Sequence, residues 1–324
     1  MKYKNIVIAG GGILGSQIAY QTAYCGFKVT ILIREEDSKT DVENKLKKLY
    51  KTYQSTIEAM SKDKNNENGT WARGIAKEGK FKKEECLENA KKALDKIVIS
   101  SSQQEALKNA DLVIESVTED FEIKTALYKQ MAKYLPAKTV IVTNSSTLLP
   151  SKMAKSTGRP DKYLSMHFAN SIWKNNIAEV MKHSGTASRY FTEIIKFAEA
   201  INMIPLAAKE EKSGYLLNSM LVPFLLSAMD LLANGVSDPE TIDKAWKYGT
   251  GAPNGPFEIL DVVGLETAKN IVLQYQKVPN IFDPLLKKMM LPYNYDGMLE
   301  IIDKYIEKGK KGKAAGEGFY KYDK

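Results

Sequence analysis

The sequence predicts an α/β domain with a mostly parallel sheet and helices on both faces, followed by an all-helical domain. Short β-branched runs alternate with helical patterns up to about residue 207, which is typical of a parallel sheet that helices cover on both sides. Beyond residue 208 the strand signals end and helical patterns remain. A length of 324 residues also fits two cores better than one. We therefore expect domains at residues 1–207 and 208–324.

The first domain opens with a βαβ unit. A strand at residues 4–9 is followed by a glycine turn, a helix at residues 13–25 and a second strand at residues 28–33. Crossovers of this kind are right-handed in nearly all proteins. Residues 41–94 then carry apolar side chains at helical intervals in two arms, which predicts an inserted helix pair. The polar stretch at residues 62–70 predicts a mobile turn between the arms.

The remaining segments follow the same two patterns. Further strands are predicted at residues 97–100, 112–115, 139–143, 163–167, 177–181 and 203–207, with helices at residues 104–108, 122–134 and 189–201. The helical domain is predicted to hold helices at residues 216–234, 239–248, 259–275, 284–291 and 296–308. The first of these has more apolar surface than a small helical domain easily buries alone, which favours a homodimer formed through this domain.

Charge and cysteine content exclude several classes of protein. The chain has 47 basic and 39 acidic residues, for a net charge of +8, which by itself fits nucleic acid, an anionic small molecule or neither. No basic stripe with interleaved aromatics, zinc knuckle or helix-turn-helix pattern is present, so we expect no nucleic-acid partner. Cys25 and Cys86 are the two cysteines, which excludes a disulfide framework and a cysteine-based metal site and suits a reducing cytoplasm.

Two apolar segments could be mistaken for targeting or membrane signals. The run at residues 6–14 is broken by three glycines and has no convincing cleavage site after it. The run at residues 215–233 contains Asn218, Pro223 and Asp230, which predicts a buried helix rather than a membrane span. We expect a cytoplasmic protein with no membrane partner.

A GxGxxG motif formed by Gly10, Gly12 and Gly15 follows the first strand and opens the first helix. Gly10 permits the tight turn, Gly12 lets the backbone approach a pyrophosphate, and Gly15 lets the helix pack closely on the strand. The N–H groups at the start of the helix, at Ile13 and Leu14, can receive the phosphates. This context predicts a dinucleotide site; a glycine turn used for packing alone is the alternative.

The tip of the second strand bears on the choice of dinucleotide. An acidic residue there hydrogen-bonds the ribose 2′-hydroxyl of NAD, but Ile33 and Arg34 occupy this corner. Arg34 can bind a 2′-phosphate, so the residues at this strand end weakly favour NADP. Glu35, Glu36 or Asp37 could instead reach the ribose in a longer turn. The cofactor is therefore predicted to be NAD or NADP.

The chain has two histidines, which restricts the search for an acid or base that titrates near neutral pH. His167 ends a predicted strand, where α/β sheets build their sites. Glu179 follows twelve residues later in another predicted strand and could return to orient the imidazole. For His167 alone, a satisfied core histidine is the alternative. His183 has no comparable setting and is expected at the surface.

Together these features resemble the 3-hydroxyacyl-CoA dehydrogenase family over nearly the whole chain. The ordered motifs that carry the resemblance are GGGILGSQIA, TNSS at residues 143–146, HFAN, AEVM, GYLLNSMLVPF, NGPFEILDVVGLET at residues 254–267 and GEGFYKY at residues 316–322. The resemblance implies a Rossmann-like domain and a helical domain that dimerises. It also implies NAD-linked oxidation of an L-3-hydroxyacyl-CoA to the 3-ketoacyl-CoA, or the reverse reaction.

By position, the resemblance assigns roles to single residues. It implies that His167 is the catalytic base, with Glu179 as its orienting partner. Ser146 would be the hydroxyl near the substrate oxygen, and Asn218 a polar anchor from the helical domain. Asn170 would hold the substrate or the nicotinamide side, and no metal is needed.

Four further residues are candidates for the cofactor side. Glu115 and Glu119 follow a strand end beside the predicted cofactor site and match acidic positions of the family. Lys124 follows on the next predicted helix, and Asn144 lies within TNSS. For the three charged residues, helix capping or a salt bridge is the alternative.

The chain departs from the family after Asn170, where the usual proline is replaced by Ser171 and a loop that contains Trp173. Trp173 could line or narrow the acyl pocket; a surface turn with an outward Trp is the alternative. The helix pair is also longer than in the family. Both departures admit a short-chain acyl-CoA, or a free 3-oxo or diketo acid, as substrate. A non-catalytic dinucleotide-binding sensor or structural protein is the alternative of another class.

Overall fold

The computed structural model describes residues 2–63, 66, 69–276 and 293–322. The chain forms two compact units, Met1–Leu216 and Leu217–Lys324. The division falls somewhat beyond the expected boundary at residues 207 and 208. The segment after the last strand is still hydrogen-bonded to the first unit, through Ser213 and Leu216, and this explains the difference.

An eight-stranded sheet forms the centre of the first unit, in the order β3-β2-β1-β4-β5-β6-β7-β8. Neighbouring strands pair in parallel except β6 and β7, which are antiparallel. The predicted mostly parallel sheet is therefore confirmed. The strands are β1 (Asn5–Ala9), β2 (Lys28–Leu32), β3 (Val98–Ser100), β4 (Leu112–Glu115), β5 (Val140–Thr143), β6 (Tyr163–Phe168), β7 (Ile177–Met181) and β8 (Ile204–Ala208).

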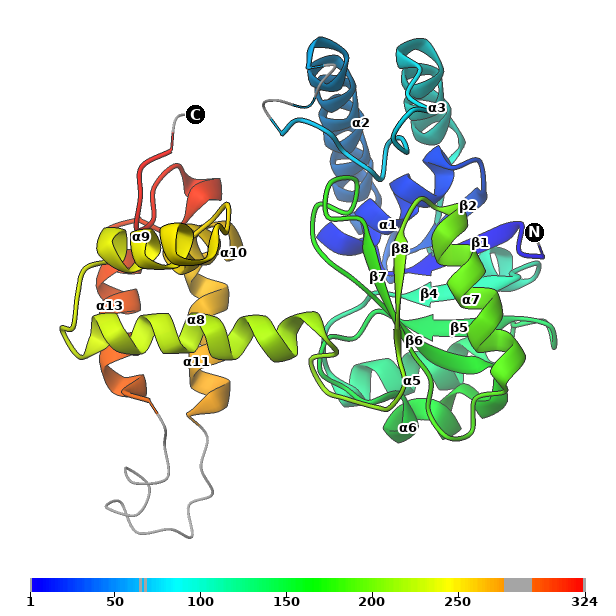
Figure 1. Ribbon diagram of the computed structural model, residues 1–324. Coiled ribbons are helices and arrows are strands. Elements are labelled where there is room, and N and C mark those ends of the chain that lie inside the picture. The colour runs from blue at the N-terminus through cyan, green and yellow to red at the C-terminus, as the bar shows by residue number, and fades with distance from the viewer. Residues whose placement is uncertain (1, 64–65, 67–68, 277–292, 323–324) are drawn as a thin grey trace, which may run out of the picture. The chain divides into compact units, whose positions relative to one another are not determined.

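Helices cover both faces of this sheet (Figure 1). Alternate residues of β1 enter different cores, with Ile6 and Ile8 on one face and Val7 and Ala9 on the other, as the pleat of a strand requires. Both faces are apolar, so the central strands β1, β4 and β5 are short apolar runs rich in β-branched residues. The first face carries α1 (Ile13–Tyr24), α2 (Lys39–Lys62), α3 (Lys83–Lys96) and α7 (Ser188–Ala200), and the second carries α4 (Gln103–Leu107), α5 (Phe121–Met131) and α6 (Pro150–Met153).

The predicted helix pair is present as α2 and α3, which pack against each other (Figure 1). The buried residues of α2 recur every three or four positions, the spacing that places them on one face of a helix. They are Val42, Leu46, Leu49, Tyr53, Ile57 and Met60. Residues 64–65 and 67–68 of the predicted mobile turn lie outside the described residues.

The described part of the second unit is built from helices around one apolar core. They are α8 (Leu217–Ala233), α9 (Pro239–Thr250), α10 (Pro256–Val263), α11 (Leu265–Tyr275) and α13 (Tyr295–Glu307). The single helix predicted at residues 259–275 is wrong, because Gly264 adopts φ +90° and separates α10 from α11. The helix predicted at residues 284–291 lies outside the described residues.

Two buried carboxylates, Asp243 and Asp261, organise the second unit. Asp261 accepts hydrogen bonds from the N–H groups of Phe319 and Tyr320 at 2.8 and 2.9 Å. Asp243 likewise accepts the N–H of Phe257 at 2.8 Å and the hydroxyl of Tyr320 at 2.9 Å. These bonds tie the C-terminal segment to α9 and α10. Among the described helices, none combines the length and apolar character needed to cross a bilayer.

Candidate active site

His167 and Glu179 face each other across the one antiparallel strand pair of the sheet. The register sets His167 of β6 opposite Glu179 of β7. His167 Nδ1 lies 2.9 Å from Glu179 Oε2, and both side chains are buried. A carboxylate accepts hydrogen bonds, so this contact favours the proton on Nδ1 and leaves the lone pair on Nε2. The sheet therefore presents an oriented imidazole base.

Ser146 completes this group from the loop after β5. Its Oγ lies 3.1 Å from His167 Nε2, the ring nitrogen turned away from Glu179. A hydroxyl there can exchange a hydrogen bond with the imidazole and with an oxygen of a bound molecule. The structure thus brings together Ser146, His167 and Glu179.

The glycine turn between β1 and α1 has the geometry of a phosphate-binding turn. Gly10 adopts φ +117°, and a Cβ there would collide with the carbonyl oxygen of Ser116. A Cβ on Gly15 would collide with the carbonyl oxygen of Gly10, so the helix and the turn are in close contact. A Cβ on Gly12 would meet no atom within 4 Å. Open space therefore lies at Gly12, at the start of α1.

The start of α1 has free hydrogen-bonding capacity. No side chain caps this helix, Ile13 is exposed, and Leu14 is partly buried. The first N–H groups of a helix have no partner within the helix and attract anions. The turn and the helix start together fit the pyrophosphate of a dinucleotide. When bound, a nicotinamide dinucleotide supplies hydride transfer, which protein side chains cannot perform.

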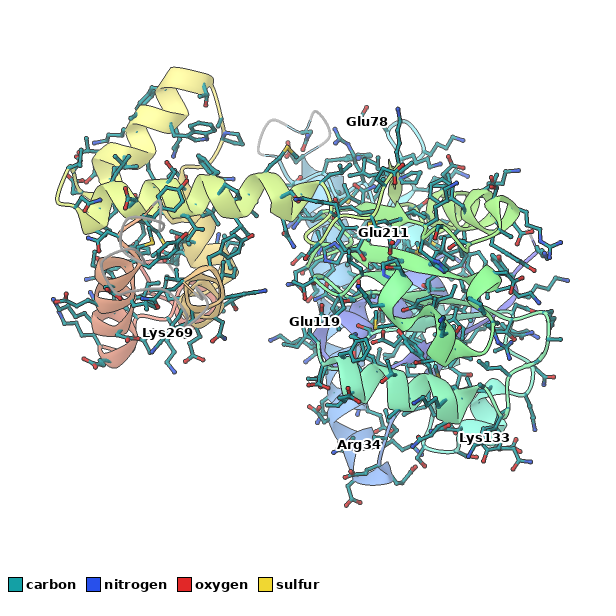
Figure 2. The ribbon with its side chains drawn as sticks, turned by 90° about the horizontal axis from the view of Figure 1, so that it is seen from below. Arg34, Glu78, Glu119, Lys133, Glu211 and Lys269 are labelled. Atoms are coloured by element: carbon teal, nitrogen blue, oxygen red, sulfur yellow. The ribbon has the colours of Figure 1, made fainter. Side chains whose placement is uncertain are left out.

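At the tip of β2, Ile33 is buried and Arg34 is exposed. A methyl group of Ile33 lies close to Gly11 of the glycine turn. The Arg34 side chain is 89% exposed and pairs with Glu35 at 2.9 Å. Figure 2 shows it at the edge of the first unit, directed away from the sheet. Lys45, which sequence reasoning missed, donates to the carbonyl of Gly11 at 3.2 Å and places a cation beside the turn.

The three charged candidates after β4 form one ion-pair network. Lys124 Nζ lies 2.6 Å from Glu115 Oε1, and both side chains are buried. Lys124 also lies 3.5 Å from Glu119, whose carboxylate accepts the Ser145 hydroxyl at 2.6 Å and the Thr147 N–H at 2.8 Å. Burial opposes ionisation of Glu119, but these hydrogen bonds and the charge of Lys124 outweigh it and hold its pKa below the ordinary value. The network thus secures the loop that carries Ser146.

The remaining predicted site residues are not hydrogen-bonded to Ser146, His167 or Glu179 in the contacts given below. Asn144 accepts the N–H of Phe168 at 3.0 Å and so joins the ends of β5 and β6. The Asn170 side chain is exposed in the loop between β6 and β7. Trp173, in the same loop, is partly buried against Tyr53 of α2, with the two rings 5.8 Å apart. Asn218 lies in the first turn of α8, in the second unit, and its role stays a prediction.

His183 is not at the surface, and that expectation is wrong. The residue is buried, with Nε2 3.0 Å from the carbonyl oxygen of Pro160. Its Nδ1 accepts the N–H of Gly185 at 3.0 Å. Backbone groups thus occupy both ring nitrogens, which explains how the ring can be buried. Among the described residues there is no cluster of three or more His, Cys, Asp or Glu side chains able to hold a metal ion.

Sequence reasoning also missed Tyr215, whose ring stacks on His167 with centroids 4.7 Å apart and planes 11° from parallel. Burial raises the pKa of the Tyr215 hydroxyl, so the group stays protonated. Leu216 donates its N–H to Glu179 Oε1 at 2.9 Å. Both residues lie in the motif GYLLNSMLVPF, but nothing in their residue types indicates contacts with His167 and Glu179.

Comparison with known proteins agrees with this geometry. The model described as "3-hydroxyacyl-CoA dehydrogenase, NAD binding domain" matches residues 5–211, and the C-terminal domain model of the same family matches residues 214–322. The human protein "Hydroxyacyl-coenzyme A dehydrogenase, mitochondrial" is 31% identical over 98% of this chain and 91% of its own length. A "Probable 3-hydroxybutyryl-CoA dehydrogenase" of Bacillus subtilis is 28% identical over 100% of this chain and 99% of its own.

A solved structure titled "Substrate-directed dual catalysis of dicarbonyl compounds by diketoreductase" is 41% identical, with a TM-score of 0.81 over 99% of this chain and 100% of that one. The structure of FadB2 from M. tuberculosis, at 24% identity and a TM-score of 0.74, shares the fold over 100% of both chains. Two family models, one for each part of the chain, together match most of it. The chain therefore belongs to the 3-hydroxyacyl-CoA dehydrogenase family and is an oxidoreductase that acts on CH–OH groups with a nicotinamide dinucleotide.

Proposed function

We propose that the protein interconverts a 3-hydroxyacyl-CoA, of short chain length, and the 3-ketoacyl-CoA, with His167 as the general acid and base. One observation carries this proposal. The imidazole is held by Glu179 through Nδ1 and presents Nε2 to Ser146 at 3.1 Å. A non-catalytic sensor or structural protein would have no need of this arrangement.

Each of these side chains has a step in the proposed reaction. In the oxidation direction, His167 Nε2 removes the proton of the C3 hydroxyl while the C3 hydride leaves for the nicotinamide. Glu179 stabilises the resulting imidazolium and keeps the ring in place. In the reduction direction, the imidazolium returns the proton to the oxygen at C3. Ser146, and by prediction Asn218, donate hydrogen bonds to this oxygen as its negative charge develops.

A free 3-oxo or diketo acid is a second candidate substrate. The 41% identical solved structure is titled as a diketoreductase that acts on dicarbonyl compounds, which favours this alternative. Trp173 packs against Tyr53 of α2 in the helix pair. A bulky side chain in this loop would favour a small substrate.

The cofactor preference is also a proposal. The tip of β2 offers the buried, apolar Ile33 where a carboxylate would repel a 2′-phosphate. Arg34 is exposed, so its side chain can turn toward an added phosphate. We propose that NADPH is accepted alongside NADH, and that Arg34→Ala raises the KM for NADPH more than that for NADH.

A steady-state comparison tests these proposals together. NADH and NADPH would each be assayed with acetoacetyl-CoA and with acetoacetate, using wild type and His167→Gln. We expect turnover with at least one pairing and its loss in the variant. The dehydrogenase proposal is overturned if neither substrate oxidises either cofactor, or if His167→Gln turns over like wild type.

We propose that the second unit mediates homodimerisation. Its helices and the turn after α8 expose large apolar side chains, including Val236 at 66%, Tyr248 at 85% and Val262 at 67%. We infer that these exposed apolar side chains belong to an interface, because such side chains are common where subunits meet. Sedimentation equilibrium at micromolar concentration should give twice the chain mass, and a monomer would contradict the proposal. The free thiols Cys25 and Cys86 fit the cytoplasm that we propose as its compartment.

A further inference from the structure

We propose that Tyr215 is a positioning residue for the reaction, and that residues 213–216 form a brace that holds Ser146, His167 and Glu179 together. This proposal rests on the proposed function, since it concerns the same base. Residues 213–216 are the last residues of the first unit, directly before α8. They contact all three members of the site, and each contact uses a different atom or ring.

The ring of Tyr215 fixes the plane of the base. It lies 4.7 Å from the imidazole of His167 and within 11° of parallel, and the Tyr215 side chain is buried. A hydrogen bond from Nδ1 to Glu179 still permits the imidazole to tilt about the line joining these two atoms. A stacked aromatic ring opposes that tilt, because it fills the space beside one face of the imidazole. Nε2 is thereby kept directed at Ser146.

The same segment holds the loop that carries Ser146. The Tyr215 hydroxyl donates to the carbonyl of Ser145 at 2.8 Å. Gly214 donates its N–H to the carbonyl of Ser146 at 3.2 Å, and Ser213 donates its hydroxyl to the carbonyl of Thr147 at 2.9 Å. Three successive carbonyls of the loop thus receive donors from three successive residues of the brace. The distance between Ser146 Oγ and His167 Nε2 depends on the position of this loop and on the orientation of the imidazole, and residues 213–216 hold both.

The brace also orients the carboxylate of Glu179, which with His167 forms the His–Glu dyad. Leu216 donates its N–H to Glu179 Oε1, while Oε2 faces His167. Each oxygen of Glu179 therefore has a separate donor, which restrains rotation of the carboxylate. Tyr215 itself adopts φ +50°, a left-handed conformation that is uncommon for a bulky residue. Packing of its ring on His167 and its bond to Ser145 account for a tyrosine at this position.

The test compares two substitutions of Tyr215 with matched substitutions of Tyr20. Tyr20 is also fully buried and donates to a backbone carbonyl, that of Ala90 at 2.7 Å, but it lies in α1 and its ring packs against Tyr53 rather than His167. We expect Tyr215→Leu to lower kcat by about tenfold to a hundredfold, because a tilted base transfers a proton poorly. KM for the cofactor should stay within about twofold, because the glycine turn is untouched. Tyr215→Phe keeps the ring and should recover most of kcat.

The controls separate positioning from stability. Tyr20→Leu and Tyr20→Phe should lower the free energy of unfolding about as much as the Tyr215 variants, yet leave kcat within about twofold of wild type. Equal loss of kcat in Tyr20→Leu and Tyr215→Leu would overturn the proposal. A Tyr215→Phe variant as slow as Tyr215→Leu would overturn the role assigned to the stacked ring, because Phe keeps the ring and loses only the hydroxyl bond to Ser145.

A spectroscopic readout keeps the test independent of turnover. The chain has two histidines, so selective labelling gives two imidazole spin systems, and His167→Gln assigns them. In Tyr215→Leu we expect the His167 ring signals to lose their ring-current shift and broaden, while those of His183 stay in place. Unchanged His167 signals would contradict the brace even in a protein with no measurable activity. If the wild-type protein has no activity but the His167 signals shift in Tyr215→Leu, the proposed function is overturned and the brace is not.

Discussion

The two units both bury carboxylates, but they use them differently. In the first unit, Glu179 faces a titratable ring, and the other nitrogen of that ring, on His167, lies beside the hydroxyl of Ser146. In the second unit, Asp261 accepts two backbone N–H groups and the hydroxyl of Tyr322, at 2.8 to 3.0 Å. The first arrangement leads to an atom that can exchange a proton with a substrate. The second joins two chain segments.

This difference shows that a buried carboxylate alone does not identify an active site. What distinguishes Glu179 is the chemistry of its partner, because imidazole gains and loses protons near neutral pH and a peptide N–H does not. The Glu115–Lys124 pair is intermediate between the two. It is buried and charged, and it supports the Ser146 loop through Glu119.

The largest effect is expected from His167→Gln, which removes the base and keeps a similar volume. We expect kcat to fall by about a thousandfold, the scale of general acid–base catalysis. Unfolding by urea should change little, because the glutamine can still donate to Glu179. Steady-state kinetics and a denaturation curve measure both. A variant with wild-type kcat would show that His167 is not the base, and Glu179 would then have no clearer catalytic role than Asp261.

Glu179→Gln should have the next largest effect. The amide no longer stabilises the imidazolium, and it can present an N–H group to the ring, which disfavours the productive tautomer. We expect kcat to fall on the order of a hundredfold, with a smaller change in the KM for the cofactor. If KM rises and kcat is unchanged, Glu179 contributes to binding rather than to the base.

Asp261→Asn is the matched substitution in the second unit. Both oxygens of Asp261 accept donors, so one amide N–H would face another donor. We expect the free energy of unfolding to fall by about 2 kcal/mol, with kcat measured at 25 °C close to wild type. A large loss of kcat in a protein that remains folded would contradict the purely structural role of this carboxylate.

The smallest effect is a pH dependence of stability carried by Glu119. Its pKa is lower in the folded protein than the ordinary value of 4.5, so its stabilising contribution is fully present above the unfolded pKa. That contribution is lost as the pH falls through the lower, folded pKa. The stability difference between wild type and Glu119→Gln should therefore be constant from about pH 7 to 5 and shrink below that. A difference that grows on acidification would show the opposite sign of shift.

Much of the fold follows from local patterns in the sequence. The central strands β1, β4 and β5 are apolar runs rich in β-branched residues, and the glycines of GxGxxG mark the turn between β1 and α1. The break at Gly264 could not be predicted in this way, because a single glycine is tolerated inside an apolar helical pattern. Its φ of +90° depends on how α10 and α11 pack.

The dyad was predictable because His167 and Glu179 lie in two strands separated by a short loop. The stacking of Tyr215 joins residues far apart in the chain, through a ring that could equally have been core. Burial of His183 was missed for a similar reason. Its partners are the backbone groups of Pro160 and Gly185, and backbone partners leave no signature in residue types.

The antiparallel pairing of β6 with β7 has a consequence for protein engineering. Because strand register sets His167 opposite Glu179, the loop at residues 169–176 is attached to the dyad at both ends without determining its geometry. Ile172 of this loop is buried and the Trp173 carbonyl accepts the N–H of Gly74, so these contacts must be kept, whereas the exposed Asn170 can be varied. Libraries of such loop sequences could then change the substrate preference while the pairing of His167 with Glu179 stays the same.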